Sequence, residues 1–68
     1  MNSSRVDIYE NVSVFDLVIH EGIERRVLST RTFANDVKSD VRTELKFEYI
    51  KTHPTIVCKP STAKITIN

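Results

Sequence analysis

Gly22 is the only glycine in this chain, and it lies between two runs that are rich in β-branched and aromatic residues. Residues 12–19 form the first run, and alternate side chains sort onto two faces, as in a strand. Glycine readily adopts the positive φ that a tight hairpin requires, so Glu21-Gly22 predicts a β-turn. A longer second strand is expected over residues 23–33.

After Phe33 the spacing of the apolar residues changes. They recur every four positions, as on one face of a helix, at Phe33, Val37, Val41, Leu45 and Tyr49. Asn35 or Asp36 is a suitable helix cap and Pro54 a terminator, so a helix is predicted over about residues 35–51, with Val41 and Leu45 facing a sheet. Residues 43–50 also alternate, which makes a strand there the alternative.

Two more strands are predicted near the C-terminus, over residues 55–59 and 62–67, with a turn at Pro60. Residues 1–10 are expected to form an N-terminal arm that could add a short edge strand. The order β-β-α-β-β over residues 11–68 predicts a single α+β domain, with one helix packed on an antiparallel sheet. The alternative is a small all-β barrel or sandwich of five strands.

The residues that common enzyme and metal sites need are missing. A single glycine cannot supply a phosphate-binding loop, and Cys58, His20 and His53 lack the paired spacing of a zinc site. Cys58 and His53 could form a nucleophile and its base, but the preceding Ile56-Val57 predicts a buried, unreactive thiol. We therefore expect no enzymatic activity, no cofactor and no bound metal.

Charge is balanced in total but not along the chain. Ten Lys+Arg against nine Asp+Glu give a formal net charge of +1, yet residues 25–33 and 49–68 carry cations and no acid. Arg25 and Arg26 are consecutive, so one must point outward, and an even offset predicts that Arg25 and Arg31 share a face. The predicted partner-binding residues are Arg25, Arg26, Arg31, Lys59 and Lys64. The competing surface is an acidic row on the predicted helix, at Asp36, Asp40, Glu44 and Glu48.

By exclusion, the chain is expected to act by presenting a surface. The first hypothesis is a small non-enzymatic protein-binding module, for example a phage or mobile-element inhibitor or adaptor of a host protein. The alternative is a nucleic-acid-binding module that uses the basic strand face. A homo-oligomer paired through the long second strand or the C-terminal strand is a further hypothesis. A lone cysteine and apolar runs far shorter than the roughly 20 residues of a membrane helix predict a cytoplasmic location without membrane contact.

Overall fold

The computed structural model describes residues 4–34 and 40–68 of the chain. These residues form one six-stranded antiparallel sheet with the strand order β1-β6-β2-β3-β4-β5. The elements are β1 (Arg5–Ile8), the short 3-10 helix η1 (Tyr9–Asn11), β2 (Leu17–His20), β3 (Ile23–Ala34), β4 (Val41–Phe47), β5 (Ile56–Pro60) and β6 (Lys64–Ile67).

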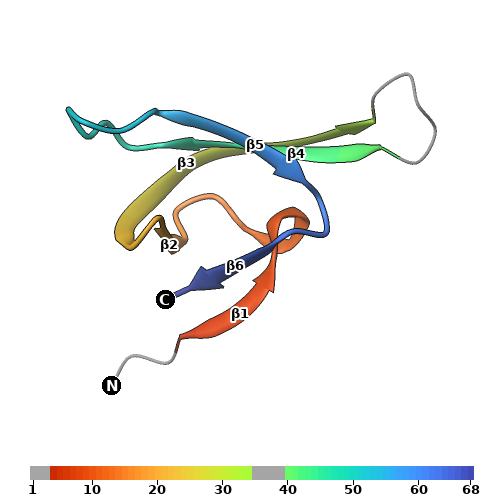
Figure 1. Ribbon diagram of the computed structural model, residues 1–68, viewed down its shortest axis with the longest axis horizontal. Helices are drawn as coiled ribbons and strands as arrows, with labels where there is room; N and C mark the ends of the chain where they lie inside the picture. Colours follow the sequence, from red (N-terminus) through yellow and green to blue (C-terminus); the bar gives the residue numbers. More distant parts are fainter. Residues whose placement is uncertain (1–3, 35–39) are drawn as a thin grey trace.

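The sheet folds over on itself along β3 (Figure 1). The start of β3 pairs with β2, whereas the rest of it pairs with β4, so this strand belongs to two layers. One layer contains β1, β6, β2 and the start of β3, and the other contains the end of β3 with β4 and β5. Each layer buries one face against the other, as two packed sheets do.

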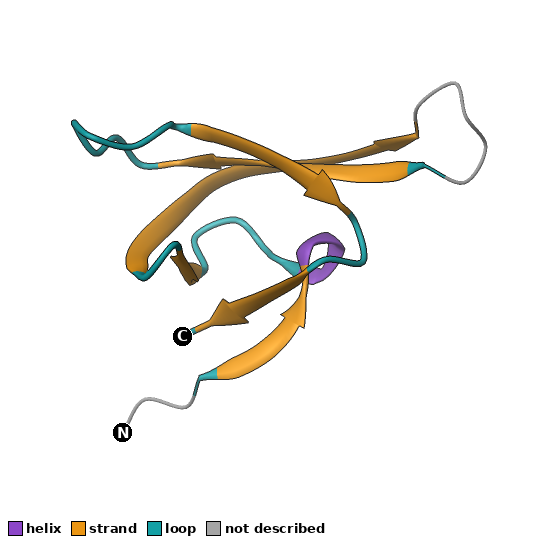
Figure 2. Cartoon of the chain, viewed as in Figure 1, coloured by secondary structure: helices purple, strands orange, loops and turns teal. Residues whose placement is uncertain are grey.

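The core lies between these layers. Its buried apolar side chains are Tyr9, Val12, Val18, Val27, Leu45, Phe47, Ile65 and Ile67. The helix η1 closes one side of the core beside the turn from β5 to β6 (Figure 2), where the N–H groups of Tyr9 and Glu10 donate to the carbonyls of Ala63 and Ser61. The segment predicted as an N-terminal arm thus contributes the edge strand β1 and the buried ring of Tyr9.

The predicted α+β class, with a helix packed on the sheet, is wrong. Residues 41–47 form the strand β4, paired with β3 on one side and β5 on the other. The remainder of the predicted helix holds no helical turn over residues 40–51, and its first part lies outside the described residues. The alternative interpretation, a small all-β domain with a strand in this segment, agrees with the structure. Among residues 4–34 and 40–68 no helix is long and apolar enough to span a membrane.

The predicted hairpin is confirmed, but its first strand is shorter than the predicted residues 12–19: β2 covers Leu17–His20, and residues 12–16 form a loop. His20 pairs with Ile23 across a two-residue turn in which Glu21 has a φ of 53° and Gly22 a φ of 78°. Positive φ at both positions is the geometry of a type I′ turn, whose twist matches that of the flanking strands. The two C-terminal strands are also confirmed, as β5 and β6, but β6 lies between β1 and β2. The C-terminal strand therefore has no free edge through which to pair with a second copy.

Candidate functional site

Arg25, the first predicted partner-binding residue, is buried. Its side chain is 1% exposed, and its guanidinium carbon lies 4.7 Å from the centroid of the Phe47 ring. Nη2 donates to the carbonyls of Glu48 and Pro54, each at 3.2 Å, whereas Nε has no hydrogen-bond partner. Arg25 thus holds the β4–β5 connection onto the core, and in this structure it is not on a partner-binding surface.

The prediction that Arg25 and Arg31 share a face is wrong because β3 contains a β-bulge. Val27 pairs with Phe47 and Ser29 pairs with Lys46, so β3 has one more residue than β4 at this point. An extra residue reverses which alternate side chains point inward. Arg25 consequently faces the core, while Arg31 lies on the outer face beside Glu44.

Arg26, another predicted partner-binding residue, lies next to Phe15. Its side chain is exposed, and its Nη1 donates to the carbonyl of Phe15 at 2.7 Å. Two backbone hydrogen bonds hold the same segment against β3: the Phe15 N–H donates to the Val27 carbonyl at 2.7 Å, and the Val27 N–H donates to the Asp16 carbonyl at 2.9 Å. The loop before β2 is therefore fixed in place beside Arg26.

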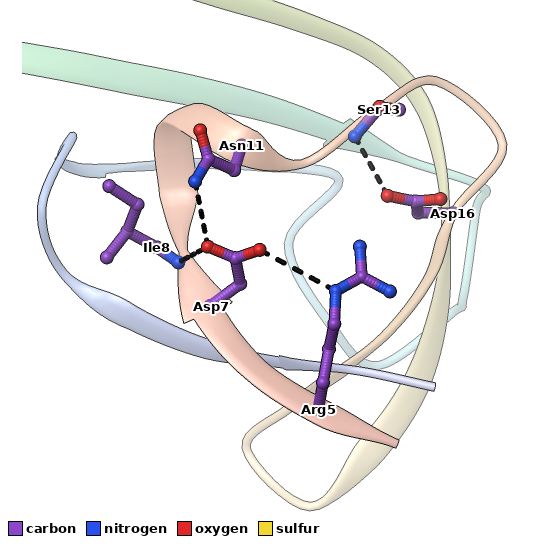
Figure 3. A network of polar contacts seen from close by, with 6 residues as sticks. All are labelled: Arg5, Asp7, Ile8, Asn11, Ser13 and Asp16. Carbon is purple, nitrogen blue, oxygen red and sulfur yellow. Dashed lines mark hydrogen bonds and ion pairs between the residues drawn. The ribbon is translucent and has the colours of Figure 1, made fainter. Parts of the chain in front are cut away.

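Phe15 has a φ of 74° and a side chain that is 68% exposed. It occupies the third position of the turn Ser13–Asp16, which is closed by an N–H of Asp16 donating to the Ser13 carbonyl. The Asp16 carboxylate in turn accepts the Ser13 N–H at 2.9 Å (Figure 3). A positive φ at this position normally belongs to glycine or asparagine, and an aromatic residue there costs about 1–2 kcal/mol.

Two further apolar residues lie close to Phe15 in the chain. Val14, the preceding residue, is exposed, and Leu17 pairs with Arg26 across β2 and β3. Because Val18 is fully buried, Leu17 must point to the outer face. We call Val14, Phe15, Leu17 and Arg26 the Phe15 patch. It joins one exposed aromatic ring, two aliphatic side chains and an arginine, a composition typical of protein interfaces.

A second surface lies on the outer face of the other layer. The Arg31 guanidinium carbon lies 4.4 Å from the centroid of the Phe33 ring, and Arg31 also pairs with Glu44 at 3.5 Å. Arg42 and Lys46 alternate with Glu44 along β4 and therefore share this face. We call Arg31, Phe33, Arg42 and Lys46 the Arg31 face.

The other two predicted residues lie apart from both surfaces. Lys59 is exposed on the edge strand β5, and Lys64 is exposed at the start of β6. Since β3 adjoins β2 and β4 rather than β5 or β6, the structure does not bring Arg26, Lys59 and Lys64 into one basic patch. Of the acidic row, Asp40 ion-pairs with Arg42 at 3.6 Å, and Asp36 lies outside the described residues.

The prediction of a buried thiol at Cys58 is wrong. Cys58 is exposed because β5 is an edge strand on which Val57, one residue earlier, points toward the core instead. His20 lies near the buried Arg25, and its ring centroid is 5.6 Å from that of Phe47. Burial lowers the pKa of His20, and only Glu21 nearby opposes that effect. In the part of the chain that the structure describes, no three His, Cys, Asp or Glu residues are grouped to hold a metal ion.

Sequence reasoning missed Phe15, which it treated as an ordinary strand residue. The signal that could have found it is the Ser13–Asp16 segment, in which serine and aspartate flank two apolar residues as in a capped turn. Comparison of the chain with models of protein families, with curated proteins and with solved structures finds no match.

Proposed function

We propose that this protein is a small, non-enzymatic protein-binding module that docks its partner on the Phe15 patch. The observation that carries the proposal is Phe15 itself, an aromatic residue at a φ of 74° whose side chain is 68% exposed. The ring contributes little to the core while its backbone conformation reduces stability. Strained residues of this kind are characteristic of sites where the side chain serves recognition.

The neighbours of Phe15 support a protein rather than a small-molecule ligand. The described residues enclose no pocket, so a ligand would have to bind a flat or convex surface. Rigid aromatic and arginine side chains on such a surface are the usual anchors of protein interfaces. Arg26 is already oriented by its hydrogen bond to the Phe15 carbonyl, so less conformational entropy is lost on binding.

The experiment compares Phe15→Gly with the wild-type chain in two measurements. Phe15→Gly should raise the free energy of unfolding by about 0.5–1 kcal/mol, because glycine adopts a positive φ without strain. The same variant should lose capture of the partner from a lysate of the native source. Val6→Thr is the matched control, since Val6 is equally exposed at 67% but lies on β1. Partner capture that survives Phe15→Gly and is lost with Arg31→Glu would contradict the proposal.

A nucleic-acid-binding module is the second candidate, and the Arg31 face favours it. Three cations and one aromatic ring, Phe33, lie on the outer face of one layer, an arrangement on which bases can stack and phosphates can be neutralised. Binding to an oligonucleotide should then weaken steeply with salt, whereas partner binding at the Phe15 patch should not.

The protein's biological role, its location and its self-association are also proposals. A role as a phage or mobile-element inhibitor or adaptor fits a small domain that offers a surface and no reaction site. A cytoplasmic location is proposed from the lone Cys58, which leaves no partner for an internal disulfide. Self-association would have to use an edge of β1, β3 or β5, because β6 is paired on both sides.

A further inference from the structure

The two outermost strands of the sheet, β1 and β5, differ in whether their outward backbone N–H groups have hydrogen-bond partners. We propose that the edge of β5 is a second binding site, which accepts an extended acidic peptide segment of a protein partner as an added antiparallel or parallel strand. The proposal goes beyond the Phe15 patch and does not depend on it. It rests on the register of β5, on the side-chain hydrogen bond at the opposite edge, and on the charges that flank β5.

At the β1 edge, one of the two outward N–H groups, that of Ile8, is bound by a side chain of the strand itself (Figure 3). The Tyr9 N–H donates to the Ala63 carbonyl, which extends the β1–β6 ladder and shows that odd-numbered residues face β6. Ile8 therefore points its N–H away from the sheet, where the Asp7 carboxylate accepts it at 2.8 Å. Asn11 and Arg5 hold that carboxylate in place, at 2.8 and 3.6 Å. A strand added to β1 would have to break this network.

The outward N–H groups of β5 have no such partner, whereas the outward carbonyl of Cys58 accepts Arg42 Nη2 at 3.5 Å. The Phe47 N–H donates to the Thr55 carbonyl and the Ser61 N–H donates to the Val41 carbonyl, so odd-numbered residues from 55 to 61 face β4. Ile56 and Cys58 therefore direct their N–H groups outward. No hydrogen bond among the described residues uses either group. Two outward N–H groups at alternate positions are the pattern that an added strand recognises.

The charges around β5 select an acidic partner. Lys59 lies on β5 itself, on the same face as Val57, while Lys46 pairs with Ile56 on the opposite face, where Arg42 is ion-paired with Asp40. The acid on this part of β4, Glu44, is ion-paired with Arg31, and residues 49–68 contain no Asp or Glu. A lysine on an edge strand discourages pairing with neutral or basic strands, whereas an acidic strand would compensate its charge.

The same charges disfavour a second copy of this chain at the edge. Two β5 strands paired with each other would place both Lys59 side chains on one face of the joined sheet, and like charges that lie close across a sheet are destabilising. The partner that fits instead carries carboxylates alongside Lys59 and an apolar side chain alongside Ile56, which is 53% exposed.

The test uses a capped synthetic peptide of about six residues in which valine and glutamate alternate, the ordinary length of a strand. Its affinity for the full chain is measured by calorimetry, and backbone amide shifts locate it. The decisive variant is Cys58→Pro, which removes an outward N–H that the ladder to β4 does not use. Cys58→Thr is the matched control, because it retains the N–H. Amide spectra establish that each variant is folded.

We expect the peptide to shift the amides of Ile56 and Cys58 and to bind at least about tenfold more weakly to Cys58→Pro than to Cys58→Thr. Lys59→Glu should weaken binding by a similar factor, and a peptide with lysine in place of glutamate should not bind. Phe15→Gly should leave peptide affinity unchanged, which separates this site from the Phe15 patch. Equal affinity for Cys58→Pro and Cys58→Thr would overturn the proposal. So would concentration-dependent dimerisation that Cys58→Pro abolishes without any peptide binding.

Discussion

The guanidinium of Arg25 packs 4.7 Å from the ring centroid of Phe47, and both side chains are almost completely shielded from solvent. Among the described residues no carboxylate pairs with this arginine; its hydrogen bonds go to the carbonyls of Glu48 and Pro54. The charge is thus compensated by backbone dipoles and by an aromatic face. This contact connects the start of β3 with the end of β4 and with the residues that lead into β5.

The first prediction concerns this arginine. Arg25→Ala should lower the free energy of unfolding by about 2–4 kcal/mol, because it removes a large buried side chain and two hydrogen bonds. Arg25→Met should lower the free energy of unfolding by less, since it keeps the contact with Phe47 and removes the unpaired Nε. Urea unfolding monitored by circular dichroism measures both. Wild-type stability in Arg25→Ala would contradict the buried position, and Arg26→Ala, an exposed neighbour, is the control.

The second prediction is a loss of stability in mild acid that depends on His20. Burial lowers the pKa of His20 below its ordinary value of 6.5, so the unfolded chain takes up the proton at a higher pH than the folded chain does. The stabilisation is therefore present above the ordinary pKa and is lost as the pH falls through it toward the folded pKa. Unfolding midpoints measured from about pH 7.5 to about pH 5.5 should decrease in the wild type and less so in His20→Gln.

His53→Gln is the control for this pH dependence. His53 bonds the exposed Thr52 hydroxyl at 2.8 Å, whereas the ring that packs on Phe47 is that of His20, so His53→Gln removes a histidine and leaves the burial of His20 in place. If the decrease of the unfolding midpoint with falling pH disappears in His53→Gln and persists in His20→Gln, the prediction for His20 is contradicted.

The error in fold class has a definite cause in the spacing of β4. Residues four apart lie on one face of a helix, but they also lie on one face of a strand, because four is a multiple of the strand period of two. A helix and a strand are distinguished by the residues that lie between positions four apart, because only a strand also buries the residue midway between them. Thr43 and Phe47 are fully buried with Leu45, which only a strand explains. Tyr49 is 73% exposed because β4 has ended by then.

Leu45→Ala is the third prediction. Leu45 was expected to be buried on a helix and is in fact buried on β4, so its truncation should still cost about 2–5 kcal/mol. Lys46→Ala, on the outer face, should change stability by less than about 0.5 kcal/mol. Thermal unfolding of the two variants tests the register of β4. Val41, expected to face the core, is 40% exposed near the open end of the β3–β4 pair, and Val41→Ala should cost much less than Leu45→Ala.

The surface positions of the predicted partner-binding residues were less predictable than the strands. The hairpin at Gly22 follows from local conformational preferences, but the bulge at Leu28 depends on how β3 must bend to join two layers. No local signal marks it, and it alone places Arg25 and Arg31 on opposite faces. Residues on either side of such a bulge cannot be assigned to a surface from their spacing.

The fourth prediction concerns the hairpin turn. Glu21 has a φ of 53°, which a glutamate adopts at a cost, whereas asparagine followed by glycine is the preferred type I′ pair. Glu21→Asn should therefore raise the free energy of unfolding by up to about 1 kcal/mol. Gly22→Ala should lower it by about 1 kcal/mol through backbone strain alone, because no atom lies within 4 Å of the added methyl group. Urea unfolding should therefore show a higher free energy of unfolding for Glu21→Asn and a lower one for Gly22→Ala.

The last prediction concerns the rate at which the Cys58 thiol reacts. The thiol was expected to be protected in a core strand, but it is exposed on the outer face of β5, opposite Glu44. A water-soluble thiol reagent should therefore label the native protein within roughly tenfold of the rate for the chain in denaturant. A control peptide containing residues 55–61 gives the rate for the free thiol. Native labelling slower by orders of magnitude would mean that something covers β5, and repeating it at lower protein concentration would show whether that cover is a second copy of the chain.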